Sequence, residues 1–308
     1  MPQKIFVIGA TGYVGNGIAL SLQSKGHGVS GLVRSERSAS QLQQAGIRPV
    51  PGDVLEDLPS VLECAVVADT VIYAAQIPLD REPDVIRSLC DRLAGSGKTL
   101  IFLSGSGVLM QRTTGAWSSD SFAEEDMFVP EPLALPRVEA EGLVRAAAHH
   151  GVRSMVVRPP VIWGPGDNGP VASTYRSIAT TGAACYIGTG LATYANVHSA
   201  DLAELFSVAL ERGKAGALYH AVGGEIPFRW IAEAVARDMN VPSRSLTMDE
   251  ATEVFGPFGA LMQSASSRLR DANTRQELGW TPTHLDMLSM IGEPRLRALA
   301  QPSITKEK

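Results

Sequence analysis

A glycine-rich turn near the amino terminus is the clearest chemical signal in the chain. The letters G-A-T-G-Y-V-G at 9–15 stand between an apolar, strand-like run at 4–8 and a helical pattern from about residue 15 to 25. Glycines at these places permit a tight turn, close approach of backbone amides to a pyrophosphate, and close packing of helix on strand. The helix amino terminus adds partial positive charge. This context favours a dinucleotide-binding loop over a merely tight turn, with the contacts made by Gly9, Thr11, Gly12, Tyr13, Val14 and Gly15.

The end of the second predicted strand indicates which dinucleotide is bound. NAD-binding proteins usually place a carboxylate there for the adenosine ribose, whereas the strand pattern of this chain puts Val33 in that position. Arg34 follows directly, and Arg37 lies three residues further on. A guanidinium can hold a 2′-phosphate through paired, charge-assisted hydrogen bonds, while a carboxylate would repel it. We therefore predict NADP(H) rather than NAD(H); the alternative is that both arginines are solvated and Glu36 serves the ribose.

A second pair of residues that bears on chemistry stands at the start of a predicted helix. The stretch E-P-L-A-L-P-R-V-E-A-E-G-L-V-R at 131–145 passes from a proline-marked loop into spaced apolar residues among charges, which predicts a helix. Leu133 and Arg137 are four residues apart and therefore share one helix face. A leucine cannot move a proton, and an arginine stays charged at neutral pH. Neither residue can therefore act as a general acid for a reaction next to this helix face.

The elements that must position these residues predict a parallel sheet covered on both faces. Short apolar runs alternate with helical patterns, as in strands that are buried on two sides. Right-handed crossovers then favour a doubly wound α/β sheet. The predicted strands are 4–8, 29–33, 47–50, 70–75, 99–104 and 152–157, with helices near 15–25, 39–45, 84–94 and 135–149.

After residue 163 the pattern changes, which predicts a smaller, partly interleaved lobe. Gly, Pro and small polar residues dominate 164–195, apart from a helical pattern at 171–181. We predict a dinucleotide-binding domain over 1–163, to which 196–222 returns, and a substrate-binding lobe over most of 164–308. In the second half of the chain we further expect a helix at 199–212 with Ser199 as N-cap, a strand at 217–222, a helix at 228–239, a loop-rich end at 243–285 and a frayed polar tail at 301–308.

Composition argues against several partners and sites. A formal net charge of −5 without a Lys/Arg run argues against nucleic acid. No apolar stretch approaches the roughly 20 residues that span a bilayer, and the chain leads from Met-Pro-Gln-Lys straight into a strand pattern, so we expect no membrane, no signal peptide and a cytoplasmic location. Three widely separated cysteines fit reduced thiols. No His/Cys/Asp cluster has ligand spacing, so no metal site is predicted.

Seven motifs spread over most of the chain carry a family resemblance. They are G-A-T-G-Y-V-G at 9–15, G-D-V at 52–54, I-Y-A-A at 72–75, F-L-S-G-S-G at 102–107, V-R-P-P-V-I-W-G-P-G at 157–166, Y-A-N-V-H-S-A-D-L-A at 194–203 and R-Q-E-L-G-W-T-P at 275–282. Together they resemble the short-chain dehydrogenase/reductase superfamily, in its extended or atypical branch close to the NAD-dependent epimerase/dehydratase group. The resemblance implies a Rossmann-type sheet, and a possible homodimer that pairs through two helices of the sheet domain.

The resemblance also implies cofactor contacts beyond the glycine loop. Ser104 is included among them as a residue next to the cofactor. The other implied contacts are Asp53 and Val54 with the adenine, Ala74, Ala75 and Gln76 with the ribose and pyrophosphate, and Pro159, Pro160 and Val161 with the nicotinamide amide.

The chemistry usual in this family needs a Ser or Thr that holds the substrate oxygen, a Tyr that exchanges the proton, and a Lys that binds the nicotinamide ribose. Ser106 best matches the first position, with Ser104 as second candidate; a turn residue is the alternative for Ser106. Leu133 and Arg137 occupy the Tyr and Lys positions. General acid catalysis typically supplies ~10²–10⁴-fold, so the loss matters. Arg137 could still contact the ribose; alternatively it is a solvent-facing charge paired with Glu141.

A replacement proton donor must come from the second lobe or be unnecessary. Tyr175 and Tyr194 lie in the segment that should line the substrate cleft, although ordinary aromatic packing also explains both. His198 and His220 are weaker candidates. Hydride addition to an iminium needs no proton on nitrogen, and a conjugated alkene can take its proton from water after an enolate forms. Ser106 and backbone amides could then stabilise the developing charge.

These observations lead to a ranked set of expected functions. The first is an NADP(H)-dependent oxidoreductase that acts on a small, fairly apolar C=O, C=N or C=C substrate, with Ser106 orienting the substrate and Arg137 holding the ribose. The alternative is a noncatalytic NADP(H)-binding sensor or scaffold. A nucleotide-sugar epimerase or dehydratase ranks third, because those reactions depend more heavily on the Tyr base.

Overall fold

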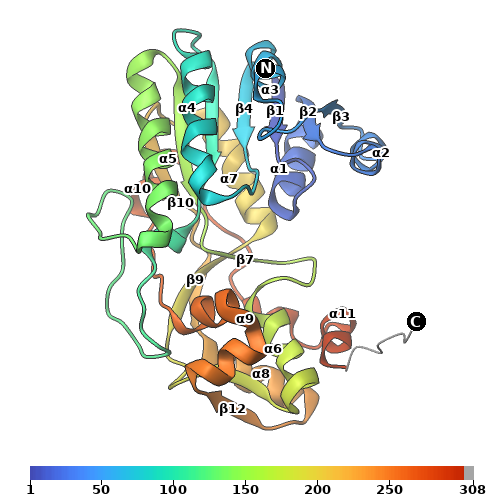
Figure 1. Ribbon diagram of the computed structural model, residues 1–308, viewed down its shortest axis with the longest axis vertical. Helices are drawn as coiled ribbons and strands as arrows, with labels where there is room; N and C mark the ends of the chain where they lie inside the picture. Colours follow the sequence, from blue (N-terminus) through green and yellow to red (C-terminus); the bar gives the residue numbers. More distant parts are fainter. Residues whose placement is uncertain (302–308) are drawn as a thin grey trace.

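A seven-stranded parallel sheet dominates the computed structural model, which describes residues 1–301; most of the predicted polar tail, 302–308, lies outside the described residues. The strand order is β10-β6-β5-β4-β1-β2-β3, so it reverses between β1 and β4 (Figure 1). Ligands of such sheets bind at that reversal, beyond the carboxyl ends of the strands. The strands are β1 (Lys4–Ile8), β2 (Gly28–Val33), β3 (Arg48–Pro51), β4 (Thr70–Tyr73), β5 (Thr99–Leu103), β6 (Arg153–Arg158) and β10 (Ala217–His220).

Helices cover both faces of the sheet, because most strand residues are apolar and point alternately to the two faces. One buried cluster packs α1, α2 and α7 against the sheet, and a second packs α3, α4 and α5 against the other face. This confirms the predicted doubly wound α/β fold. None of the helices described within residues 1–301 is long and apolar enough to cross a membrane. The bounds are α1 (Tyr13–Ser24), α2 (Glu36–Gln44), α3 (Leu58–Val67), α4 (Glu82–Leu93), α5 (Leu135–Ala146) and α7 (Ser199–Arg212).

A smaller lobe lies below the sheet in Figure 1. It contains a three-stranded sheet of order β11-β9-β7 and a two-stranded sheet of β12 and β8. Its main core gathers Trp163, Tyr175 and Phe228 between the strands and helices. The bounds of its elements are β7 (Val161–Trp163), β8 (Ala184–Ile187), β9 (Thr193–His198), β11 (Gly224–Pro227), β12 (Ser243–Leu246), α6 (Gly169–Thr181), α8 (Phe228–Met239), α9 (Met248–Ser264) and α11 (Pro294–Arg297); α10 (Ala272–Leu278) belongs to the large sheet's side of the molecule.

The chain returns to the large sheet after β9. Helix α7 packs on α1 through Leu202, Leu205 and Phe206, and β10 pairs in parallel with β6. Helix α10 then packs beside α7 and β10. The two parts of the molecule are therefore interleaved along the sequence, while the boundary at residue 163 stays a prediction.

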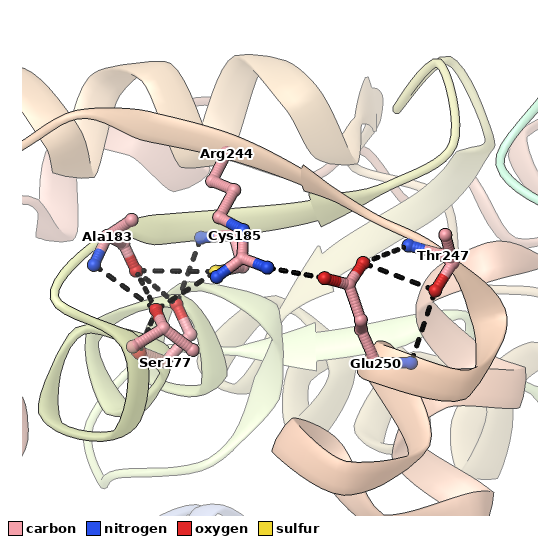
Figure 2. A network of polar contacts seen from close by, with 7 residues as sticks. Ser177, Ala183, Cys185, Arg244, Thr247 and Glu250 are labelled. Carbon is pink, nitrogen blue, oxygen red and sulfur yellow. Dashed lines mark hydrogen bonds and ion pairs between the residues drawn. The ribbon is translucent and has the colours of Figure 1, made fainter.

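The expectation of a loop-rich segment at 243–285 is wrong, since that range holds β12, α9 and α10. Helix α9 begins with a capping box, in which Glu250 N donates to Thr247 Oγ1 at 3.3 Å and Thr247 N donates to Glu250 Oε2 at 2.8 Å (Figure 2). The helix is kinked at Gly256, where φ is 72°, and Pro257 follows. This interruption splits the apolar periodicity, which is why the pattern reads as a loop.

Two smaller differences concern helix starts. Helix α3 was not expected; it begins after Asp57, whose carboxylate accepts from Ser60 N. The expected N-cap Ser199 is instead the first residue of α7, and the cap is His198, whose Nδ1 accepts from Ala200 N at 3.2 Å. An imidazole nitrogen can replace a hydroxyl as a cap, which the preference for Ser does not anticipate.

An extended segment at 265–270 ties the second lobe to the loop that follows β5. Ser266 exchanges two backbone hydrogen bonds with Gln111, and Phe122 N donates to Arg268 O at 2.9 Å. Ala195 N, on β9, donates to Ser267 O at 2.9 Å. Ser267 is thereby held between β9 and the loop that carries Ser106.

A buried carboxylate at the start of α7 holds the segment that follows α10. Asp201 is 5% exposed and accepts hydrogen bonds from Thr283 Oγ1 at 2.8 Å, Thr283 N at 3.1 Å and His284 N at 2.8 Å. Burial acts to raise the pKa of Asp201, but the hydrogen bonds from His284 and Thr283 outweigh it and leave the pKa below its ordinary value. Since an unfolded chain lacks these bonds, ionised Asp201 stabilises the folded state.

We predict that Asp201→Asn lowers the free energy of unfolding by about 1–3 kcal/mol at pH 7, because buried donors lose a charged acceptor. The contribution is present above the ordinary Asp pKa of about 4 and is lost as the pH falls through the lower folded pKa. Urea unfolding between pH 3 and 8 should therefore show the variant and the wild type converging in acid. The control Asp91→Asn, exposed on α4, should have little effect; a deficit for Asp201→Asn that is independent of pH would contradict the role of the charge.

Candidate active site

The glycine-rich turn packs against the loop after β4 with no room for side chains. A Cβ on Gly9 would lie 2.5 Å from the carbonyl carbon and oxygen of Ala74, and φ at Gly9 is 96°. A Cβ on Gly15 would lie 2.2 Å from the carbonyl oxygen of Gly9. Ala74 N also donates to Ile8 O at 2.7 Å. The structure thus brings the predicted residues Gly9, Gly15, Ala74 and Ala75 together where the strand order reverses.

The amino terminus of α1 offers free amide groups beside this turn. Its N-cap is Gly12, which has no side chain to accept a hydrogen bond, and its first turn contains no acidic residue. The first backbone N–H groups of a helix have no partner within the helix, so those of Tyr13 and Val14 can bind an anion. Thr11 and Tyr13 are exposed here. This cradle fits the pyrophosphate of a dinucleotide.

The adenosine end of the predicted site lies beyond β2 and β3. Val33, the last residue of β2, is buried, while the Arg34 side chain is 78% exposed. Arg34 Nη1 lies 3.7 Å from Asp53 Oδ2, a loose ion pair, and Asp53 Oδ1 accepts from Leu55 N at 2.8 Å. Val54 is buried, and Arg37 is exposed near the start of α2. The predicted adenosine residues therefore gather at one edge, with Arg34 free to turn toward a phosphate.

Ser104 and Ser106 follow β5 and differ in what their hydroxyls contact. Ser104 Oγ donates to Glu141 Oε1 at 2.5 Å and is committed to that carboxylate. Ser106 N donates to Pro159 O, and Ser106 O accepts from Ser267 Oγ at 2.9 Å. Within residues 1–301, Ser106 Oγ makes no hydrogen bond to a protein group, and the residue is 2% exposed. The geometry favours Ser106 over Ser104 as the group that faces a substrate.

Glu141 also forms a buried ion pair that joins α5 to β6. Arg158 donates to its two oxygens, from Nε at 2.8 Å and from Nη2 at 2.5 Å, and both side chains are at most 5% exposed. The guanidinium of Arg158 lies over the Phe128 ring, 5.2 Å from its centre. Pro159 and Pro160 follow Arg158 directly and are buried, while Val161 is half-buried. The pair therefore fixes the predicted nicotinamide segment relative to α5.

Arg137 does not pair with Glu141, so the alternative of a solvent-facing Arg137–Glu141 contact is wrong. Its side chain is 17% exposed, and its Nε lies 2.6 Å from Oε2 of Glu82, the first residue of α4. The sequence reasoning missed Glu82. A signal was present, because Glu82 shares the apolar helix stripe of Ile86, Leu89 and Leu93, where a carboxylate is unexpected.

The hydroxyls and imidazoles proposed as substitute donors are mostly engaged elsewhere. Tyr175 is fully buried in the second lobe; its hydroxyl donates to Asp238 Oδ2 at 2.6 Å and accepts from Gly292 N. Burial and the Asp238 hydrogen bond raise the pKa of Tyr175 to about 12. Tyr175 is therefore a packing residue, and we do not retain it in the site. His220 is buried too, and burial lowers its pKa to about 4.

Tyr194 remains near the site but is enclosed. It is 3% exposed and lies beside Ser267, the residue that contacts Ser106. Burial raises the pKa of Tyr194, which makes its hydroxyl reluctant to ionise. Leu133, by contrast, is 41% exposed. The surface that would carry the family's tyrosine is therefore apolar and accessible.

A cavity of about 440 Å³ lies beside the segment that follows β7 rather than at Ser106. The imidazoles of His198 and His284 stack 4.1 Å apart in its lining, and Trp163 meets His198 edge-on. Burial, and then the neighbouring His284, lower the pKa of His198. Of the cofactor-binding and proton-donor candidates named from the sequence, only His198 lines this cavity among the described residues. Over the same range, 1–301, no group of His, Cys, Asp and Glu is arranged to hold a metal ion.

Comparison with known proteins gives a family match over most of the chain. The sequence profile of the NAD dependent epimerase/dehydratase family matches residues 5–222. The chain is 36% identical over 298 residues to an uncharacterized protein of Schizosaccharomyces pombe, which covers 93% of this chain and 97% of the relative. It is 27% identical over 233 residues to 4-hydroxy-2-methyl-3-oxo-4-farnesyl-3,4-dihydroquinoline-1-oxide ketoreductase of Stigmatella aurantiaca, covering 72% and 68% of the two chains.

Solved structures agree on the fold. The dTDP-glucose 4,6-dehydratase of Bacillus anthracis, in complex with NAD, superposes with a TM-score of 0.73 at 16% identity. The match covers 96% of this chain and 95% of that one. At this level of identity the similarity shows the arrangement of helices and strands and nothing about the substrate.

We predict that Gly15→Ala lowers the midpoint of thermal unfolding, because its Cβ would overlap the carbonyl of Gly9. Gly17 lies in the same helix with no heavy atom within 4 Å of a built Cβ. Gly17→Ala should therefore stabilise the protein by about 0.5–1 kcal/mol through helix propensity alone. Differential scanning calorimetry on both variants measures the contrast, and equal effects would show that the close contact of the turn is unimportant.

Proposed function

Because the chain belongs to the NAD-dependent epimerase/dehydratase family, we propose that it is an NADP(H)-dependent reductase of a small, fairly apolar C=O, C=N or C=C substrate. The family match and the ketoreductase relative support an oxidoreductase that uses a nicotinamide dinucleotide. The apolar, accessible position of Leu133 supports a substrate of low polarity. The choice of NADP(H) and the nature of the substrate are the parts that experiment must test.

The residues around the glycine turn fit the proposed cofactor. The α1 amino terminus and the Gly9–Ala74 contact would hold the pyrophosphate, and Arg34 would hold a 2′-phosphate by turning from its loose contact with Asp53. Bound NADP(H) would supply or accept a hydride at the nicotinamide. Pro159 and Ser106 follow β6 and β5, on the other side of β1 from Arg34. There the substrate would meet the nicotinamide.

The observation that carries the proposal is the setting of Ser106. Its backbone is fixed on both sides, by Pro159 of the sheet domain and by Ser267 of the second lobe, while its hydroxyl is uncommitted. A fixed hydroxyl donor next to a nicotinamide can stabilise negative charge that develops on a substrate oxygen. Ser104, held by Glu141, could not do so without breaking a buried hydrogen bond.

The proton must come from a source other than the usual tyrosine. Leu133 supplies none, and Tyr194 is enclosed. Water can deliver the proton to an alkoxide or to the carbon of an enolate once Ser106 has stabilised the anion, and hydride addition to an iminium needs no proton at all. Substrates that tolerate solvent protonation are therefore favoured, and C=N and conjugated C=C groups fit best.

A noncatalytic NADP(H) sensor is the second candidate, and one observation favours it. The Tyr and Lys positions of the family are held by an apolar side chain and by an arginine that is engaged with Glu82. Nucleotide-sugar epimerisation or dehydration is disfavoured for the same reason, since the abstraction of a proton in those reactions depends on a strong base at the position of Leu133.

For the cofactor, we predict that wild-type protein binds NADPH at least about tenfold more tightly than NADH, since a guanidinium pairs with the 2′-phosphate. Arg34→Asp should reverse this order by adding repulsion to the lost contact. Fluorescence titration of both dinucleotides measures the two affinities, with Arg48→Asp, exposed on β3, as a control for surface charge. Equal affinities in the wild type and in both variants would refute the assignment.

For turnover, we predict NADPH oxidation with at least one member of a panel of aldehydes, ketones, cyclic imines and enones. Ser106→Ala should lower kcat by about 10²–10³, with little change in NADPH affinity. Ser119→Ala, exposed in the same long loop, is the matched control. Tight NADPH binding without oxidation across the panel would replace the reductase by the sensor.

A further inference from the structure

Three contacts hold the guanidinium of Arg137 in one orientation. Its Nε lies 2.6 Å from Glu82 Oε2, and its Nη1 donates to the carbonyl of Leu103 at 3.2 Å. Its Cζ lies over the ring of Phe102, 5.5 Å from the ring centre. The three partners come from α4 and from the last two residues of β5, so the group is fixed at the carboxyl end of the sheet.

One nitrogen of this guanidinium is left for a ligand. Within residues 1–301, no protein acceptor receives a hydrogen bond from Arg137 Nη2, although the neighbouring Nε and Nη1 are both engaged. The guanidinium of Arg137 contacts Leu103, the residue that precedes Ser104. It is also near the end of β4, where Tyr73 pairs with Phe102. The loop at 74–76 starts there and carries the residues expected to border the ribose. The free donor therefore lies at the carboxyl ends of β4 and β5, where the loop at 74–76 and the serine loop begin.

Glu82 is an unusual partner, because it is completely buried. Its oxygen is close to Arg137 Nε, but the N–H does not point along that line, and neither oxygen receives an aligned hydrogen bond among the described residues. Tyr73 from β4, and Arg137 and Glu141 from α5, are the charged or titratable groups that act on it. A carboxylate in such a place costs folding free energy. Its presence there is therefore better explained by a function than by stability.

We propose that Glu82 is a positioning residue, which holds Arg137 so that its Nη2 is presented to the hydroxyls of the nicotinamide ribose. The inference rests on the proposed function and deepens it. A lysine in this position needs no orientation, because its ammonium is a point charge with freely turning donors. A guanidinium is planar and must be turned correctly to present a given N–H; the ion pair with Glu82 together with the Nη1–Leu103 hydrogen bond supplies that constraint.

The anchor depends on pH in a defined direction. Burial raises the pKa of Glu82 to about 7, opposed by Arg137 and assisted by the charge of Glu141. Above pH 7 the carboxylate is ionised and pairs with Arg137; as the pH falls through 7 it takes up a proton and the ion pair is lost. Tyr73 stays neutral over this range, because burial and then Glu82 raise its pKa. Ribose binding should therefore weaken between pH 8 and pH 6.

Three ligands separate this role from a general structural one. NADPH and 2′-phospho-ADP-ribose both contain the ribose that Arg137 would contact, whereas adenosine 2′,5′-bisphosphate lacks it and keeps the 2′-phosphate. At pH 8, Glu82→Gln should weaken binding of the first two by roughly tenfold, the size of a charge-assisted contact, and leave the third unchanged. Glu82→Asp should restore part of the loss. Glu139→Gln, an exposed carboxylate on α5 that pairs with Arg87, should change none of the affinities.

The pH dependence provides the second measurement. In the wild type, the affinity for 2′-phospho-ADP-ribose should show an additional fall from pH 8 to pH 6, beyond that caused by titration of its 2′-phosphate, and comparison with Glu82→Gln at each pH cancels the titration of the ligand. Glu82→Gln should abolish this fall. Arg137→Met should show the same selective loss as Glu82→Gln, which keeps the test valid if one variant folds poorly.

The possible outcomes are distinct. Equal weakening of all three ligands, or no weakening of any, would overturn the role of Glu82 and leave the proposed reductase intact. A wild-type protein that binds none of the three ligands would overturn the proposed function and this inference together.

Discussion

The buried ion pair between Glu141 of α5 and Arg158 of β6 is the interaction on which the candidate site depends. It joins α5 to β6, and Glu141 also accepts a hydrogen bond from Ser104, which follows β5. Removing one partner of such a pair typically costs about 3–5 kcal/mol, because the other charge is left unpaired in the interior. Arg137 on α5, the serine loop and the Pro159 segment are thus positioned by one contact. Leu133, expected on the same helix face as Arg137, lies instead in the 3-10 turn Pro132–Ala134 that precedes α5.

The central sheet could be predicted from the sequence because its signals are local. Short apolar runs define the strands, several of them bounded by Gly or Pro, and the turn at Gly9 needs only its neighbours for interpretation. The failures share the opposite property. Glu82 becomes a candidate site residue only through its contact with Arg137, and Ser267 only through its contact with Ser106. In both pairs the partners are far apart in the sequence. Helix α9 was missed because Gly256 and Pro257 interrupt a pattern that packing of the second lobe restores.

The replacement of the usual Tyr and Lys changes two groups with different consequences. Leucine at 133 removes the proton and leaves an apolar surface, so it alters which substrates can react. Arginine at 137 keeps the positive charge but adds planarity, so it alters how the ribose can be held. The arginine is accompanied by a buried acid, whereas the leucine is not accompanied by a new hydroxyl with access to the site. On the proposed function, the arginine with its buried partner would therefore preserve ribose binding, while proton transfer would have no such replacement.

This asymmetry bears on the choice between a reductase and a sensor. A sensor needs the glycine turn, Arg34 and Arg137, all of which belong to the sheet domain and its edge. It does not need the second lobe to reach across and fix the carbonyl of Ser106, as Ser267 does. A serine whose backbone is fixed while its hydroxyl makes no protein hydrogen bond is the arrangement that the proposed substrate site would need. The extended segment at 265–270 therefore favours the reductase, in which a second ligand lies next to the nicotinamide and Ser106 assists the reaction without a partner acid.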